Sequence, residues 1–65
     1  MNWELYEVWT IDEDGFEDLV DTTHSLKEAR ELAIASLSEE GIVECVIFEE
    51  DLEGELIEIE RVKKE

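Results

Sequence analysis

The sequence predicts an α+β fold: a four-stranded antiparallel sheet built from two hairpins, with one helix packed on one face, in the order ββαββ. Three observations support this prediction. Helical periodicity is confined to residues 25–40, a strand–turn–strand pattern lies on each side of that segment, and both turns are acidic and end in glycine. Proline is absent and no flexible linker interrupts the chain, so we expect residues 1–65 to form a single compact domain.

The first hairpin is expected in residues 3–23. Residues 3–11 are rich in aromatic and β-branched types, residues 12–15 supply an acidic turn, and residues 16–23 return antiparallel. Side-chain alternation divides the apolar residues between two faces, and we assign the larger set to the core. The predicted core face contains Leu5, Trp9, Ile11, Phe16 and Val20, and the predicted open face contains Tyr6, Val8 and Leu19.

The central helix is predicted to begin at Leu26. Ser25 and Glu28 form a capping-box pattern, in which a serine hydroxyl and a glutamate three residues later satisfy free amides of the first turn. Gly41 is expected to end the helix after about 14 residues, because glycine adopts a left-handed conformation without a steric penalty. The predicted buried face is rich in small residues, so the helix can lie close to a sheet. It contains Leu26, Ala29, Leu32, Ala33, Ser36 and Leu37.

The second hairpin is expected over residues 42–62, with its turn at 51–54. Both turns read D-x-x-G, a pattern typical of a type I turn that ends in a glycine bulge. A four-residue loop predicts an apolar face that meets the helix, with an ion pair at its rim. On that face Phe48 opposes Ile57, Val46 opposes Ile59 and Glu44 opposes Arg61, which leaves Val43, Cys45 and Ile47 on a half-exposed reverse face.

The acidity of the chain is extreme. Twenty-one acidic residues against five basic ones give a formal net charge of −16, yet 43% of the residues are apolar and patterned, which is typical of a folded chain. Self-repulsion of this size destabilises a compact state, so we expect a positively charged partner, with solubility as the alternative explanation. The predicted partner-binding acids are Asp12, Glu13, Asp14, Glu17, Asp18, Asp21, Glu49, Glu50, Asp51, Glu53, Glu55, Glu58 and Glu60.

The sequence does not gather the residue types that catalysis needs. Cys45 is the single cysteine and lies in an apolar run, so we expect a buried structural thiol, and the spacing of His24 does not suggest a Cys–His dyad. Asp12 and Asp14 resemble the start of a calcium loop, but Gly15 comes fourth rather than sixth, which favours a plain acidic turn. We therefore predict no enzymatic activity, no cofactor and no metal site.

Direct nucleic-acid binding is disfavoured, because affinity for phosphates comes from Lys and Arg. No apolar run approaches the length of a membrane span, and Met1 is followed by Asn2 and Trp3 without a basic or apolar leader. We therefore expect a cytoplasmic protein with no direct contact to a membrane.

In length, mixed α/β pattern and acidity, the whole chain resembles the small acidic anti-CRISPR proteins of phages, especially those that block the DNA-binding surface of type I Cascade complexes. The resemblance involves no signature motif, so no individual residue is assigned a role by it. It implies a non-catalytic inhibitor that mimics DNA with its carboxylates, binds a Cascade subunit in the cytoplasm of an infected bacterium, and exists as a monomer or weak homodimer. Acidic phage proteins that inhibit restriction enzymes share the same features.

Two further hypotheses stay open. A small structural or adaptor module would bind a neutral protein partner or itself through the open apolar sheet face, predicted to contain Tyr6, Val8, Leu19, Val43 and Ile47. Its binding should depend little on salt, whereas binding by DNA mimicry should weaken steeply as salt increases. A calcium-dependent module would be stabilised by calcium beyond the effect of ionic strength.

Overall fold

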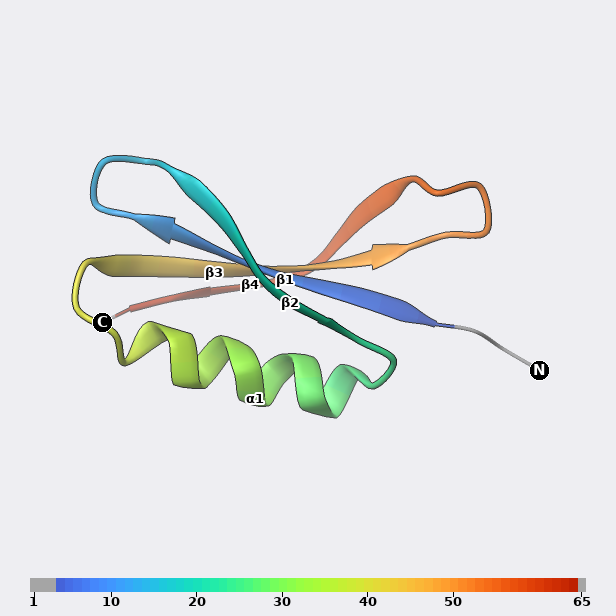
Figure 1. Cartoon of the computed structure of the whole chain (residues 1–65), viewed down its shortest axis with the longest axis horizontal. Coiled ribbons are helices and arrows are strands. Elements are labelled where there is room, and N and C mark those ends of the chain that lie inside the picture. The colour runs from blue at the N-terminus through green and yellow to red at the C-terminus, as the bar shows by residue number, and fades with distance from the viewer. Residues whose placement is uncertain (1–3, 65) are drawn as a thin grey trace.

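The computed structural model describes residues 4–64 and confirms the ββαββ fold (Figure 1). The strands form one antiparallel sheet in the order β2-β1-β3-β4, so the two hairpins are joined through the pairing of β1 with β3. The helix packs against one face of this sheet, and Trp3 of the predicted first strand lies outside the described residues. The elements are β1 Leu5–Asp12, β2 Glu17–Thr23, α1 Leu26–Leu37, β3 Ile42–Glu50 and β4 Leu56–Lys63.

The two D-x-x-G turns have the same hydrogen bonds, as their shared pattern predicts. The amide of Asp12 donates to the carbonyl of Phe16 at 3.0 Å, and the amide of Gly15 donates to the carbonyl of Asp12 at 3.0 Å. In the second turn, the amide of Asp51 donates to the carbonyl of Glu55 at 2.9 Å, and the amide of Gly54 donates to the carbonyl of Asp51 at 3.0 Å. The closing glycines have φ angles of 88° and 87°, which side-chain-bearing residues rarely adopt.

The start of α1 follows the predicted cap in part. The hydroxyl of Ser25 accepts a hydrogen bond from the amide of Glu28 at 3.3 Å. The carboxylate of Glu28 does not return to Ser25 but accepts from the hydroxyl of Thr23 at 2.7 Å, which ties the end of β2 to the first helical turn. The helix has 12 residues and ends before Ser38, so it is shorter than expected, and Gly41 lies in the turn that enters β3.

The faces of the central strands are the reverse of those predicted. Tyr6 and Val8 lie under the helix with Cys45 and Ile47, and all four are buried. The helix presents Ala29 and Ala33 to them, and the thiol of Cys45 donates to the carbonyl of Ala33 at 3.3 Å. A helix with such small side chains lies too close to the sheet to cover residues as large as Trp9 and Phe48. Trp9 and Phe48 therefore lie on the opposite face of the sheet. The prediction that the larger group of apolar residues in the first hairpin forms the core beneath the helix is wrong.

The predicted register also needs correction. The second turn is not the predicted four-residue loop, because Asp51 bonds to Glu55 across three residues. In addition, Ile59 is an extra residue in β4 that shifts its pairing with β3, and Val20 is an extra residue in β2 that shifts its pairing with β1. Phe48 pairs with Glu58, Val46 with Arg61 and Glu44 with Lys63, while Ile57 and Ile59 are exposed. Phe16 and Val20, both assigned to the core, are exposed on the first hairpin. An inserted residue exchanges the two faces of a strand, which is why one register error misplaced several side chains.

Candidate acidic interface

The acidic turns lie at opposite ends of the sheet. Because β1 and β3 are antiparallel neighbours, the first turn lies beside the start of β3, where Asp12 pairs with Ile42. The second turn lies beside the start of β1, where Leu5 pairs with Glu50. At about 3.3 Å per residue, the length of β3 separates the turns by on the order of 30 Å. The acids predicted from the sequence therefore form two groups rather than one (Figure 1).

The first hairpin carries the more continuous acidic surface. Every charged residue from Glu4 to Asp21 is acidic. β2 is an edge strand, and its residues from Glu17 to Thr22 are exposed. None of the described acids of this hairpin forms an ion pair with a described Lys or Arg. An uncompensated row of carboxylates on a strand edge attracts cations and repels phosphates.

Two of these carboxylates also hold the backbone. Oδ1 of Asp12 accepts hydrogen bonds from the amides of Asp14 and Phe16, both at 2.9 Å. Oδ1 of Asp21 accepts from the amide of Thr22 at 2.8 Å. Each carboxylate keeps its second oxygen for other partners, so these residues contribute to the turn and to the surface charge together.

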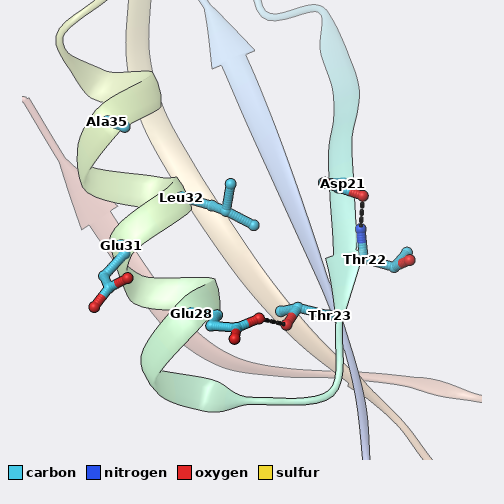
Figure 2. A pocket seen from close by; sticks show the side chains of 7 residues that line it. All are labelled: Asp21, Thr22, Thr23, Glu28, Glu31, Leu32 and Ala35. Atoms are coloured by element: carbon cyan, nitrogen blue, oxygen red, sulfur yellow. Dashed lines mark hydrogen bonds between the residues drawn. The ribbon is translucent and has the colours of Figure 1, made fainter.

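A pocket of about 340 Å³ between β2 and α1 extends the acidic edge (Figure 2). Asp21 lies on its strand side, and Glu28 and Glu31 lie on its helix side. Leu32 and Ala35 supply the apolar part of the lining, and Thr22 and Thr23 complete it. Glu28 and Glu31 are absent from the sequence prediction, although their spacing of three residues places them on one helix face. We call Glu17, Asp18, Asp21, Glu28 and Glu31 the β2 strip.

The second hairpin is partly neutralised. Nη2 of Arg61 lies 2.7 Å from Oε1 of Glu58, and Nη1 lies 2.9 Å from Oε1 of Glu44. Nε of Arg30 lies 3.1 Å from Oε2 of Glu60. The hydrogen bond from Arg61 lowers the pKa of Glu58, and the hydrogen bonds to both carboxylates raise the pKa of Arg61. The predicted ion pair between Glu44 and Arg61 is therefore present, while Glu58 and Glu60 are paired rather than free.

The remaining acids of the second group surround the other turn. Oδ1 of Asp51 accepts from the amides of Glu53 and Glu55, both at 2.9 Å, as Asp12 does in the first turn. Glu53 and Glu55 are exposed, and Glu49 and Glu50 are only partly exposed at the end of β3. Consecutive strand residues point to opposite faces, so these last two carboxylates do not act on one surface.

The inward-facing tyrosine reports the electrostatic field of the sheet. The hydroxyl of Tyr6 donates to Oε2 of Glu4 at 2.7 Å. This hydrogen bond, burial and the charges of Glu4 and Glu49 raise the pKa of Tyr6 to about 12. The tyrosine is therefore held as a neutral hydrogen-bond donor.

The thiol of the single cysteine is not exposed. Cys45 is buried, and burial followed by the charges of Glu39 and Glu44 raises the pKa of its thiol, so the nucleophilic thiolate is disfavoured. Within residues 4–64, no three His, Cys, Asp or Glu side chains are grouped closely enough to hold a metal ion. The helix described here lacks the length and apolar character needed to cross a membrane.

Comparison of the chain with protein-family models, with curated proteins and with solved structures finds no match.

Proposed function

We propose that this chain is a non-catalytic inhibitor that occupies a basic nucleic-acid-binding surface of another protein and thereby blocks nucleic-acid binding. One observation supports this proposal above the others. The exposed edge of the first hairpin, from Glu4 to Thr22, carries only acidic charges, and none of them forms an ion pair with a described Lys or Arg. A chain with a net charge of −16 gains most by placing such a surface against Lys and Arg side chains.

The spacing of the carboxylates is compatible with a surface that normally binds nucleic acid. Alternate residues on a strand are about 6.7 Å apart, and neighbouring strands are about 4.8 Å apart. Within the β2 strip, Asp18 and Asp21 pair with Thr10 and Val8, which alternate along β1, so these two carboxylates lie on one face of the sheet. Their separation is of the order found between phosphates along one nucleic-acid strand, whereas Glu17 pairs with Ile11 and lies on the other face. Such binding releases counterions from both partners and weakens as salt increases. In line with the resemblance described above, the proposed partner is the DNA-binding surface of a bacterial defence complex such as type I Cascade.

A displacement experiment tests the proposal. Labelled duplex DNA is bound to type I Cascade and, separately, to an unrelated basic DNA-binding protein, and the purified chain is titrated in at low and physiological salt. We expect displacement from Cascade at both salt concentrations and none from the unrelated protein at physiological salt. Displacement from both proteins at low salt alone would indicate a nonspecific polyanion, and no displacement from either would overturn DNA competition at these targets.

Charge-neutralising variants identify the acidic group that acts. Replacing Glu17 by Gln and both Asp18 and Asp21 by Asn removes three charges from the β2 strip. A control with Glu40, Glu53 and Glu55 replaced by Gln removes three exposed charges elsewhere. We expect the first variant to lose about tenfold or more in potency, equivalent to about 1.4 kcal/mol, with a shallower salt dependence. Equal losses in both variants would show that total charge matters and that the β2 strip has no special role.

A further inference from the structure

The sheet face opposite α1 carries a group of apolar side chains. Leu19, Trp9, Val46 and Arg61 pair in register across all four strands, which places them in one row on that face. Side-chain alternation adds residues above and below this row. We call the apolar members of this surface the open face: Leu5, Trp9, Ile11, Leu19, Val46, Phe48 and Leu56.

The open face is partly self-covered at its centre and exposed toward its edges. Val46 is 2% exposed although it lies on the side away from the helix, because Trp9 and Arg61 flank it. Leu19 and Leu56 are 48% and 43% exposed. The indole nitrogen of Trp9 donates to Oε1 of Glu7 at 3.0 Å, so the polar end of this ring already has a partner. A partner that covered this face would therefore bury apolar surface without breaking a polar contact.

The rim of the open face is acidic. Glu7, Glu17, Glu44, Glu50 and Glu58 alternate or pair with the apolar residues and so lie on the same side of the sheet. Two basic residues, Arg61 and Lys63, lie on this side as well, so five acids exceed two bases there, and Arg61 is already held by two of the carboxylates. A second copy of the chain would bring another −16 charges against this rim, which opposes self-association. Charge complementarity instead favours a partner with an apolar centre and Lys or Arg around it.

The shape of the sheet indicates what kind of segment fits. Both hairpin turns curve to the side of the sheet away from α1, so they flank the open face at its two ends (Figure 1). An α-helix is about 10 Å across, which is close to the width occupied by the central strands β1 and β3 at about 4.8 Å per strand. Helices that bind such surfaces combine an apolar stripe with flanking basic residues.

We propose that the open face binds a basic amphipathic helix of the partner protein. The apolar stripe of that helix packs on Trp9 and Phe48, and its Lys and Arg side chains meet the acidic rim. This inference rests on the proposed function in one respect, that the partner is basic. It adds that apolar contact, and not charge alone, holds the complex.

Two synthetic helical peptides of equal length and charge test the inference. In the first, Lys residues flank a stripe of Leu at positions i, i+3, i+4 and i+7, and in the second each Leu is replaced by Gln. Backbone amide NMR titrations at physiological salt measure affinity and locate the contact. We expect the Leu/Lys peptide to bind about tenfold or more tightly than the Gln/Lys peptide, with the largest shifts in β1 and β3.

A pair of variants provides the matched control. Leu19→Gln combined with Leu56→Gln should remove most of the preference for the Leu/Lys peptide, because both leucines are exposed on the open face. Ile34→Gln changes a residue that is 66% exposed on α1 and should leave the preference unchanged. Thermal melting of each variant identifies any loss of affinity that arises from unfolding.

The outcomes separate this inference from the proposed function. Equal, salt-dependent binding of both peptides would overturn the open-face inference while DNA displacement could still support the inhibitor function. Preferential binding of the Leu/Lys peptide without any DNA displacement would support the open face and overturn DNA competition at the tested targets. Sedimentation of a stable dimer whose interface maps to the open face would show that a second copy covers it, which also overturns the inference.

Discussion

At the scale of single residues, Tyr6 gives the sharpest test of the electrostatic field. Its hydroxyl donates to Glu4, and its pKa is raised to about 12. The unfolded value is about 10, so folding favours the neutral phenol. The resulting stabilisation is fully present below the unfolded pKa and is lost as pH rises through the folded pKa.

Tyr6 is the single tyrosine, so phenolate absorbance reports its ionisation directly. We expect a midpoint near 12 in the native protein. Glu4→Gln should lower the midpoint more than Glu49→Gln, because the hydrogen bond to Glu4 is the first cause of the shift and the charge of Glu49 the last. A native midpoint at the ordinary value of about 10 would contradict the hydrogen bond.

Asp12 allows charge and structure to be separated at one position. Asp12→Asn keeps an Oδ1 acceptor for the two turn amides and removes one negative charge, whereas Asp12→Ala removes both. We expect Asp12→Ala to destabilise the fold by about 1 kcal/mol and Asp12→Asn to be neutral or stabilising. Urea denaturation measures the difference, and equal losses in both variants would show that the carboxylate charge, rather than the acceptor, holds the turn.

At the scale of elements, the small residues of α1 fix its distance from the sheet. Ala33 is fully buried, and its carbonyl accepts from the thiol of Cys45. Ala33→Leu should therefore destabilise the protein by about 1–3 kcal/mol, because the helix must move away from β3 to admit the larger side chain. Ala35→Leu, on the exposed side at the pocket, is the control and should change stability by less than about 0.5 kcal/mol. Chemical denaturation of both variants tests this, and equal losses would contradict close packing at Ala33.

The elements themselves could be predicted from the sequence, because local signals determine them. The serine cap, the D-x-x-G turns and the two periodicities involve only near neighbours in the chain. The strand faces could not be assigned by choosing the larger apolar residues. The alanines of α1 bring the helix close to the sheet, and this short distance leaves room for Val8 and Cys45 but not for Trp9 and Phe48. The predicted register was wrong for two reasons. Asp51 bonds to Glu55 across three residues rather than four, and the extra residues of the bulges, Val20 in β2 and Ile59 in β4, have no comparable signature.

At the scale of the whole molecule, the arrangement of the acidic residues could not be predicted from their positions in the sequence. The sequence shows which residues are acidic, but the pairing of β1 with β3 places the two turns at opposite ends of the sheet. The hydrogen bond between Thr23 and Glu28 places a helix carboxylate beside the edge of β2. Glu60 and Glu58 form ion pairs with Arg30 and Arg61, so these two carboxylates are not free to bind a partner. Each of these changes depends on residues that are distant along the chain or belong to different elements.

The net charge of −16 predicts the response of the entire fold to salt. Screening of the carboxylates should raise the melting temperature as sodium chloride increases, because the repulsion is spread over the surface and the described ion pairs are few and largely exposed. A gain of about 1 kcal/mol corresponds to roughly 4–8 °C in a domain of this size. The variant lacking the charges of Glu17, Asp18 and Asp21 should melt higher in low salt and respond less to added salt. A melting temperature that falls with salt would show that the Arg30 and Arg61 ion pairs outweigh the repulsion, and it would remove the physical reason for expecting a basic partner to stabilise this chain.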